Sequence, residues 1–110
     1  MAAGTVHIPW YATLFRGDRF VEALEEIAPL ALRYGATGYR VYRSRDDGYK
    51  FLQTVEFEDK LDWERYWNGP EFIQWRASYS SWYQVPVLYV WNDIVAEGRS
   101  EVQQPIEQGV

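Results

Sequence analysis

Few side chains in this 110-residue chain could carry acid–base chemistry, and it has a single histidine, His7. His7 is a candidate base or proton shuttle, because an imidazole titrates near neutral pH. It lies close to Pro9 near the start of an apolar segment, and an exposed or structurally bonded histidine is the alternative. Arg40, Arg43 and Arg76 are the cations that could hold an enolate or a carboxylate. A surface ion pair is the alternative for each of them.

Aromatic side chains are the unusual feature of the composition. The chain has six Trp, nine Tyr and five Phe, so a single small core has little room for all of them. Trp63 and Trp67 are four residues apart and share a helix face. They could wall a pocket for a flat ligand, and ordinary helix-to-sheet packing is the alternative. The candidate residues for binding a small aromatic ligand are Tyr11, Trp63, Trp67, Phe72, Trp75, Tyr79 and the cation Arg76.

Several kinds of site are disfavoured by what the sequence lacks. It has no Cys, which excludes disulfides and thiolate ligands, and with one His we expect no metal and no other cofactor. A net charge of −5 without a Lys/Arg run argues against nucleic-acid binding. We find no phosphate-binding glycine loop and no hydrolase motif. Without a secretory signal or an apolar run of membrane-spanning length, we expect a cytoplasmic protein that does not enter the membrane.

The elements that must position these residues follow from periodicity. Residues 6–16 carry rings on both alternating faces, which predicts a strand covered on both sides, with Pro9 at an edge or bulge. Asp18 is the expected N-cap of a helix that Pro29 kinks or divides and Gly35 ends. The apolar stripe of this helix is Phe20, Leu24, Ile27, Ala31 and Tyr34.

The middle of the chain predicts a hairpin and then a broken helix. Residues 38–45 and 49–58 alternate on either side of Asp46-Asp47-Gly48, which is an antiparallel hairpin signal. Residues 60–82 predict a helix, a break at Asn68-Gly69-Pro70, and a second helix that begins with Pro70. Asn68 could polarise a ligand oxygen, and a turn or cap residue is the alternative.

The end of the chain completes one domain. Residues 85–94 alternate and predict the last strand, with Pro86 at an edge or unpaired position. We therefore expect one domain over residues 1–96 and a polar C-terminal tail over 97–110. The order β-α-β-β-α-β is the α+β ferredoxin-like arrangement, a four-stranded antiparallel sheet with helices on one face. The other face also carries large apolar side chains, so we expect a homodimer that buries it.

Three segments carry a resemblance to a known family. They are Gly38-Tyr39-Arg40-Val41-Tyr42-Arg43, the strand Phe51 to Phe57 with the acidic Glu58-Asp59 after it, and Pro70-Glu71-Phe72. Together with the element order over roughly residues 6–95, they resemble the antibiotic-biosynthesis-monooxygenase-like group of dimeric α/β-barrel proteins. The resemblance lies in order and spacing more than in a sharp motif, so it supports fold better than function.

The resemblance implies a dimeric barrel of two sheets, with a pocket between the sheet and the helices of each subunit. Some members oxidise aromatic polyketides or quinols with O₂ and neither metal nor flavin, some degrade haem, and others have no assigned activity. Many carry a His where this chain has Tyr66, which disfavours histidine chemistry at that position. The catalytic candidates in this chain are His7, Tyr66 and Asn68. The expected function is a cofactor-independent monooxygenase of a small quinol-like or polyketide-like molecule. The alternatives are a non-catalytic small-ligand-binding or interaction module and, less favoured, a haem-binding protein.

Overall fold

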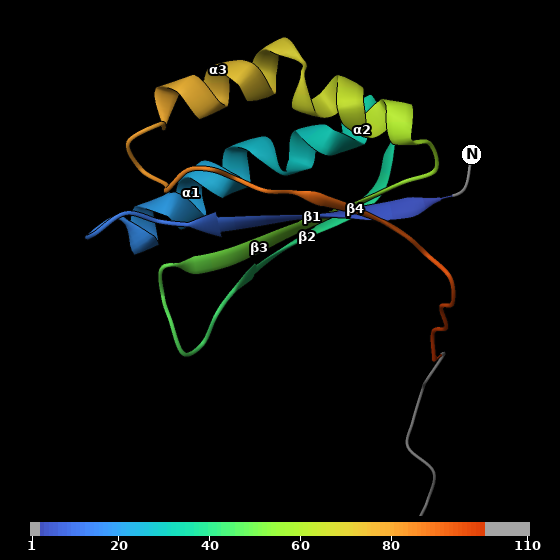
Figure 1. Ribbon diagram of the computed structural model, residues 1–110, viewed down its shortest axis with the longest axis horizontal. Helices are drawn as coiled ribbons and strands as arrows, with labels where there is room; N and C mark the ends of the chain where they lie inside the picture. Colours follow the sequence, from blue (N-terminus) through green and yellow to red (C-terminus); the bar gives the residue numbers. More distant parts are fainter. Residues whose placement is uncertain (1–2, 101–110) are drawn as a thin grey trace, which may run out of the picture.

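One sheet and one layer of helices make up residues 3–100, the part of the chain that the computed structural model describes (Figure 1). The strands form an antiparallel sheet in the order β2-β3-β1-β4, and the helices lie on one face of it. The predicted α+β ferredoxin-like fold is confirmed. No helix among these residues is long and apolar enough to span a bilayer. The elements are β1 (Gly4–Tyr11), α1 (Gly17–Ile27), the 3₁₀ helix η1 (Pro29–Tyr34), β2 (Ala36–Arg43), β3 (Lys50–Phe57), α2 (Lys60–Trp67), α3 (Pro70–Ser78) and β4 (Val90–Asp93).

The alternation in β1 separates the two faces of the sheet as predicted. Val6, Ile8 and Trp10 are buried beneath the helices. His7 and Tyr11 point to the opposite, open face, because successive side chains of a strand alternate. The sheet therefore stands between the helix-side core and any ligand that touches His7.

The first strand is shorter than the predicted span 6–16. It ends at Tyr11, and the chain then turns, with the Arg16 N–H bonded to the Thr13 carbonyl at 3.0 Å. Phe15 adopts a φ of 68° within this turn. The alternation of apolar residues continues into the turn. For that reason the sequence pattern predicts a strand end that lies too far along the chain.

The last strand is also shorter than predicted. It pairs with β1, which therefore lies inside the sheet between β3 and β4. Only Val90–Asp93 pairs, against Gly4–His7, whereas the prediction was 85–94. Pro86 has no N–H to donate to a neighbouring strand, which fits the irregular path of the residues that precede β4. Pro9 lies beyond the end of the β4 ladder and pairs only on the β3 side.

The helix predictions are confirmed, with two corrections. Pro29 divides the first helical segment into α1 and η1, which ends at Gly35 with a φ of 100°. Pro70 begins α3, as expected from its fixed φ. However, Asp18 is not the N-cap of α1: it lies in the first turn, and its carboxylate pairs with Arg43 at 2.9 Å. The second helix ends at Ser78 rather than near residue 82.

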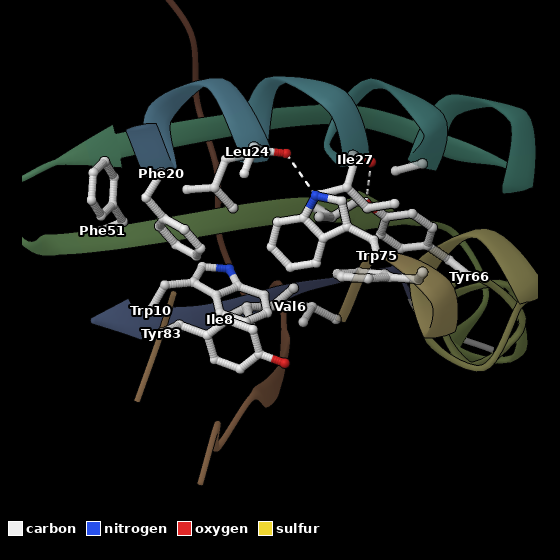
Figure 2. Close-up of a cluster of buried hydrophobic side chains, with 14 of the residues drawn as sticks. Val6, Ile8, Trp10, Phe20, Leu24, Ile27, Phe51, Tyr66, Trp75 and Tyr83 are labelled. Atoms are coloured by element: carbon white, nitrogen blue, oxygen red, sulfur yellow. Dashed lines mark hydrogen bonds between the residues drawn. The ribbon is translucent and has the colours of Figure 1, made fainter. Parts of the chain in front are cut away.

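Aromatic rings fill the space between sheet and helices. Trp10 lies at the centre, with its ring centroid 5.8 Å from that of Phe20, 5.3 Å from Trp75 and 5.0 Å from Tyr83. Figure 2 shows Phe20, Leu24 and Ile27 of α1 directed toward these rings. Edge-to-face contacts of this kind add to the burial of the rings themselves. Much of the aromatic excess is therefore core.

Candidate functional site

The structure places the three predicted catalytic residues in three separate environments. His7 is on the open face of the sheet, Tyr66 is buried in the core, and Asn68 follows the end of α2 at the surface. One small ligand could not contact all three, because the sheet and the packed core lie between them.

Tyr66 has the bonding of a structural residue. Its hydroxyl donates to the Ile27 carbonyl at 2.6 Å and accepts from Gln53 Nε2 at 3.3 Å. Burial raises the pKa of Tyr66, so its phenol stays protonated at neutral pH. It can donate a hydrogen bond, but it is not suited to removing a proton from a substrate.

Most of the predicted ring contacts lie together. The rings form one continuous series, in which neighbouring centroids are 5.3 Å apart for Trp63–Trp67, 4.9 Å for Trp67–Phe72 and 5.6 Å for Phe72–Trp75. Tyr79 continues it, 5.3 Å from Trp75. Because α2 and α3 follow each other directly, their inward-facing residues meet on one side of the layer.

Tyr11 is the predicted contact residue that lies elsewhere. It stands on the open face, at the end of the sheet beside the β2–β3 turn, where its hydroxyl donates to Asp47 at 2.6 Å. That hydrogen bond raises the pKa of Tyr11 and lowers the pKa of the Asp47 carboxyl. The hydrogen bond between Tyr11 and Asp47 links β1 to the β2–β3 turn.

Arg76 is a partly buried cation held by aromatic rings. Its Cζ lies 3.9 Å from the Trp67 ring centroid and 5.0 Å from that of Phe72, in cation–π contact. The guanidinium donates one hydrogen bond, to the Trp67 carbonyl at 2.9 Å, and no carboxylate among residues 3–100 is within ion-pair distance. Burial lowers the pKa of Arg76, which marks an environment unfavourable to an uncompensated positive charge.

Tyr89 adds a residue that the sequence analysis missed. Its ring centroid is 4.8 Å from that of Trp63 and 5.1 Å from that of Trp67, and 39% of the residue is exposed. The predicted last strand includes Tyr89 but gives it no role. The signal in the sequence is its alternation with Trp91, which in the structure pairs with the helix-side residue Val6.

Trp63 carries an unsatisfied hydrogen-bond donor. The residue is fully buried, and its Nε1 has no hydrogen-bond partner within the described part of the chain. Buried donors without partners are rare in folded proteins. We call Trp63, Trp67, Arg76 and Tyr89 the Arg76 cluster.

The chemistry of the Arg76 cluster suits a flat anion. Trp67 and Tyr89 offer partly exposed ring surface, and Arg76 offers a cation that has no carboxylate partner among residues 3–100, whereas the Trp63 N–H is buried. A phenolate or enolate oxygen is the group that a guanidinium both neutralises and hydrogen-bonds.

Two of the surface grooves, neither of them lined by the Arg76 cluster, contain residues named above. One, of about 320 Å³, runs between α1 and α3 and is lined by Trp75, Tyr79, Glu26 and Glu71, among others. Tyr79 donates to Glu26 at 2.9 Å, and the hydrogen bond from Tyr34 lowers the pKa of Glu71. The other groove, of about 730 Å³, lies on the open face of the sheet and includes His7.

Comparison with known proteins gives matches in structure only. No protein-family model matches the sequence, and no curated protein does. A candidate antibiotic biosynthesis monooxygenase from Nitrosomonas europaea superimposes with a TM-score of 0.76 at 16% identity, over 84% of this chain and 89% of that one. SnoaB of Streptomyces nogalater, described as a cofactor-independent oxygenase, gives 0.71 at 12% identity, over 96% and 99%.

Other solved structures with the same fold have no assigned role. A protein of unknown function from Nitrosomonas europaea gives a TM-score of 0.76 at 16% identity, over 93% of this chain and 98% of that one. At such identities the likeness establishes fold rather than activity. The chain therefore has the ferredoxin-like fold of the antibiotic-biosynthesis-monooxygenase-like proteins.

Proposed function

We propose that this protein is a cofactor-independent monooxygenase of a small phenol-like aromatic molecule, that it works as a homodimer, and that the Arg76 cluster is its site. The observation that carries the proposal is the Arg76 guanidinium, stacked on Trp67 at 3.9 Å without a carboxylate partner among the described residues. A cation in that position favours the deprotonated form of a bound phenol or enol.

The reaction that follows needs an electron-rich anion and O₂. Arg76 holds the anionic oxygen, and Trp67 and Tyr89 pack against the ring of the substrate. The anion passes one electron to O₂, and the two radicals combine at carbon to form a peroxide anion. This anion takes up the proton that the substrate lost, which gives a hydroperoxide. For a substrate with a reactive CH₂ group, loss of water then leaves a carbonyl, so CH₂ and O₂ become C=O and H₂O.

The fold likeness supports this proposal without deciding it. SnoaB, one of the solved structures with this fold, is described as a cofactor-independent oxygenase. Several others are of unknown function, so the activity must be measured on this chain.

The test is O₂ uptake by the purified protein with a panel of anthrones and quinols. We expect uptake that depends on the protein. We expect Arg76→Gln to lower kcat/KM about 10- to 100-fold, because a charge-assisted hydrogen bond to the substrate anion is lost.

The matched control is Arg19→Gln, which removes an exposed arginine of α1 and should leave uptake unchanged. Absence of uptake by the unmodified protein across the panel would refute the proposed activity. Equal activity of the Arg76→Gln and Arg19→Gln variants would refute the proposed site.

A non-catalytic ligand-binding protein is the second candidate. It is favoured by Tyr66, whose hydroxyl is committed to Ile27 and Gln53 and is therefore no base. Thermal-shift measurements separate the two candidates, because a ligand that raises Tm without any O₂ uptake is bound but not turned over.

A further inference from the structure

The open face of the sheet carries a groove that the proposed site does not use. Its volume is about 730 Å³, which is within the range of small-molecule sites. The strand register sets three polar side chains in one row across it: Arg40 of β2 lies opposite Thr54 of β3, and Thr54 lies opposite His7 of β1. Figure 1 shows the chain after β4 leaving the sheet on the side away from the helices. Arg99, on this segment, also lines the groove.

Positive charge gathers in this groove although the chain as a whole is acidic. Arg40 and Arg99 line it together with one carboxylate, Glu56, in a chain of net charge −5. Among residues 3–100, the side chains of His7, Thr54 and Glu56 make no hydrogen bond or ion pair within the chain. Within the same residues, Arg40 makes one side-chain hydrogen bond, a long contact of 3.5 Å with the Tyr42 hydroxyl. The donors in the row are therefore free for a ligand.

Exposed apolar side chains lie on the same face of the sheet as the groove. Tyr42 of β2 lines the groove and is 47% exposed, Val90 of β4 pairs with His7 and is 53% exposed, and Tyr11 at the end of β1 is 38% exposed. Exposed apolar side chains beside a polar groove are suited to burial against another protein surface. A second copy of the same face, related by a two-fold axis, would cover these side chains on both copies and join both grooves into one chamber. In that chamber each copy contributes two arginines against one glutamate, so closure favours an anion within it.

We propose that this groove is a second ligand site, which binds a small aromatic carboxylate between the sheet faces of two copies. The site rests on the homodimer of the proposed function and is incomplete in a single chain. The carboxylate accepts hydrogen bonds from Arg40 and Thr54, and its ring packs against the exposed apolar side chains beside the groove. His7 supplies a further ring nitrogen at the end of the row.

The experiment uses the full chain and the probe 1-naphthoate, with neutral 1-naphthamide as the matched probe. Affinity is measured by titration calorimetry, and mass by sedimentation with and without probe. We expect 1-naphthoate to bind at least 10-fold more tightly than the amide and to strengthen dimer formation. Arg40→Gln should weaken 1-naphthoate binding about 10-fold or more, and Thr54→Val about 3-fold, whereas Arg19→Gln should leave it unchanged.

Thr54→Val keeps the shape and charge of the face, so it still tests the site if Arg40→Gln impairs folding. The inference is overturned if neither substitution weakens the probe, or if the probe-saturated protein is monomeric. Weakening by Arg76→Gln alone would place the probe at the Arg76 cluster and also overturn it. Loss of probe binding in Arg40→Gln in a protein without O₂ uptake would uphold this site while refuting the proposed activity.

Discussion

Phe15 holds a backbone conformation that its side chain disfavours. Its φ is 68°, a left-handed value that costs a residue with a Cβ about 1–2 kcal/mol. The ring contributes little in return, because the residue is 85% exposed. Phe15→Gly should therefore raise the free energy of unfolding by about 0.5–1 kcal/mol and Tm by a few degrees.

The matched control is Leu14→Gly, an exposed neighbour without positive φ, which should lower Tm. Thermal unfolding by circular dichroism checks both, and a lower Tm for Phe15→Gly than for Leu14→Gly contradicts the argument.

At the same scale, sequence alone could nominate site residues but could not rank them. Arg76 was one of three candidate cations, and only the packing of α3 against Trp67 distinguishes it from Arg43, which pairs with Asp18. Tyr66 was nominated through its position in a resemblance. Its partners Ile27 and Gln53 are distant in the chain, so the commitment of its hydroxyl emerges only from the fold.

At the scale of elements, one buried amide connects the sheet to the helices. Gln53 of β3 is fully buried, accepts from Trp10 Nε1 at 3.0 Å and donates to the Tyr66 hydroxyl at 3.3 Å. Gln53→Leu should lower the free energy of unfolding by about 1–3 kcal/mol, because Trp10 loses its acceptor in the core. The control is Gln74→Leu on the exposed side of α3, with little expected effect. Urea unfolding measures both, and equal midpoints would contradict a role for this network in stability.

Periodicity predicted which elements exist better than where they end. Pro29 and Pro70 fix a break and a helix start through the proline ring itself, so local chemistry decided both. The ends of β1 and β4 depend instead on which neighbour supplies the ladder. At the end of β1, the Tyr11 carbonyl accepts a hydrogen bond at 2.9 Å from the N–H of Gln84, which precedes β4 and is distant in the chain, so no local pattern contains it.

At the scale of the whole molecule, the open face predicts self-association. We expect light scattering at micromolar concentration to give about twice the mass of the 13.0 kDa chain, because two copies that pair through the same face form a closed two-fold dimer. Val90→Asp puts a charge on the open face and should shift the protein toward monomer. Ile73→Asp is the control, because Ile73 is 49% exposed on α3, on the helix side. A monomeric unmodified protein, or equal masses for the two variants, would contradict this assignment of the interface.

For the whole molecule, the sequence could predict the fold but not where the many aromatic rings lie. The order of elements sufficed for the fold, because a ferredoxin-like sheet with one helix layer follows from β-α-β-β-α-β. The destination of the rings did not follow, since a core ring and a pocket ring have the same spacing. Trp75 illustrates this: it is 5% exposed, bonds the Ala23 carbonyl through its indole N–H at 2.7 Å, and still borders the groove between α1 and α3.

The contact of several indoles has an optical consequence. Trp10 lies 5.3 Å from Trp75 and 6.5 Å from Trp67, and Trp67 lies 5.3 Å from Trp63, measured between ring centroids. Excitation absorbed by any of these chromophores is shared among its neighbours, so their ultraviolet emission reports on the group rather than on one residue. Because Arg76 rests on one member of the group, the protein carries an intrinsic fluorescent reporter at the place where we propose that substrate binds.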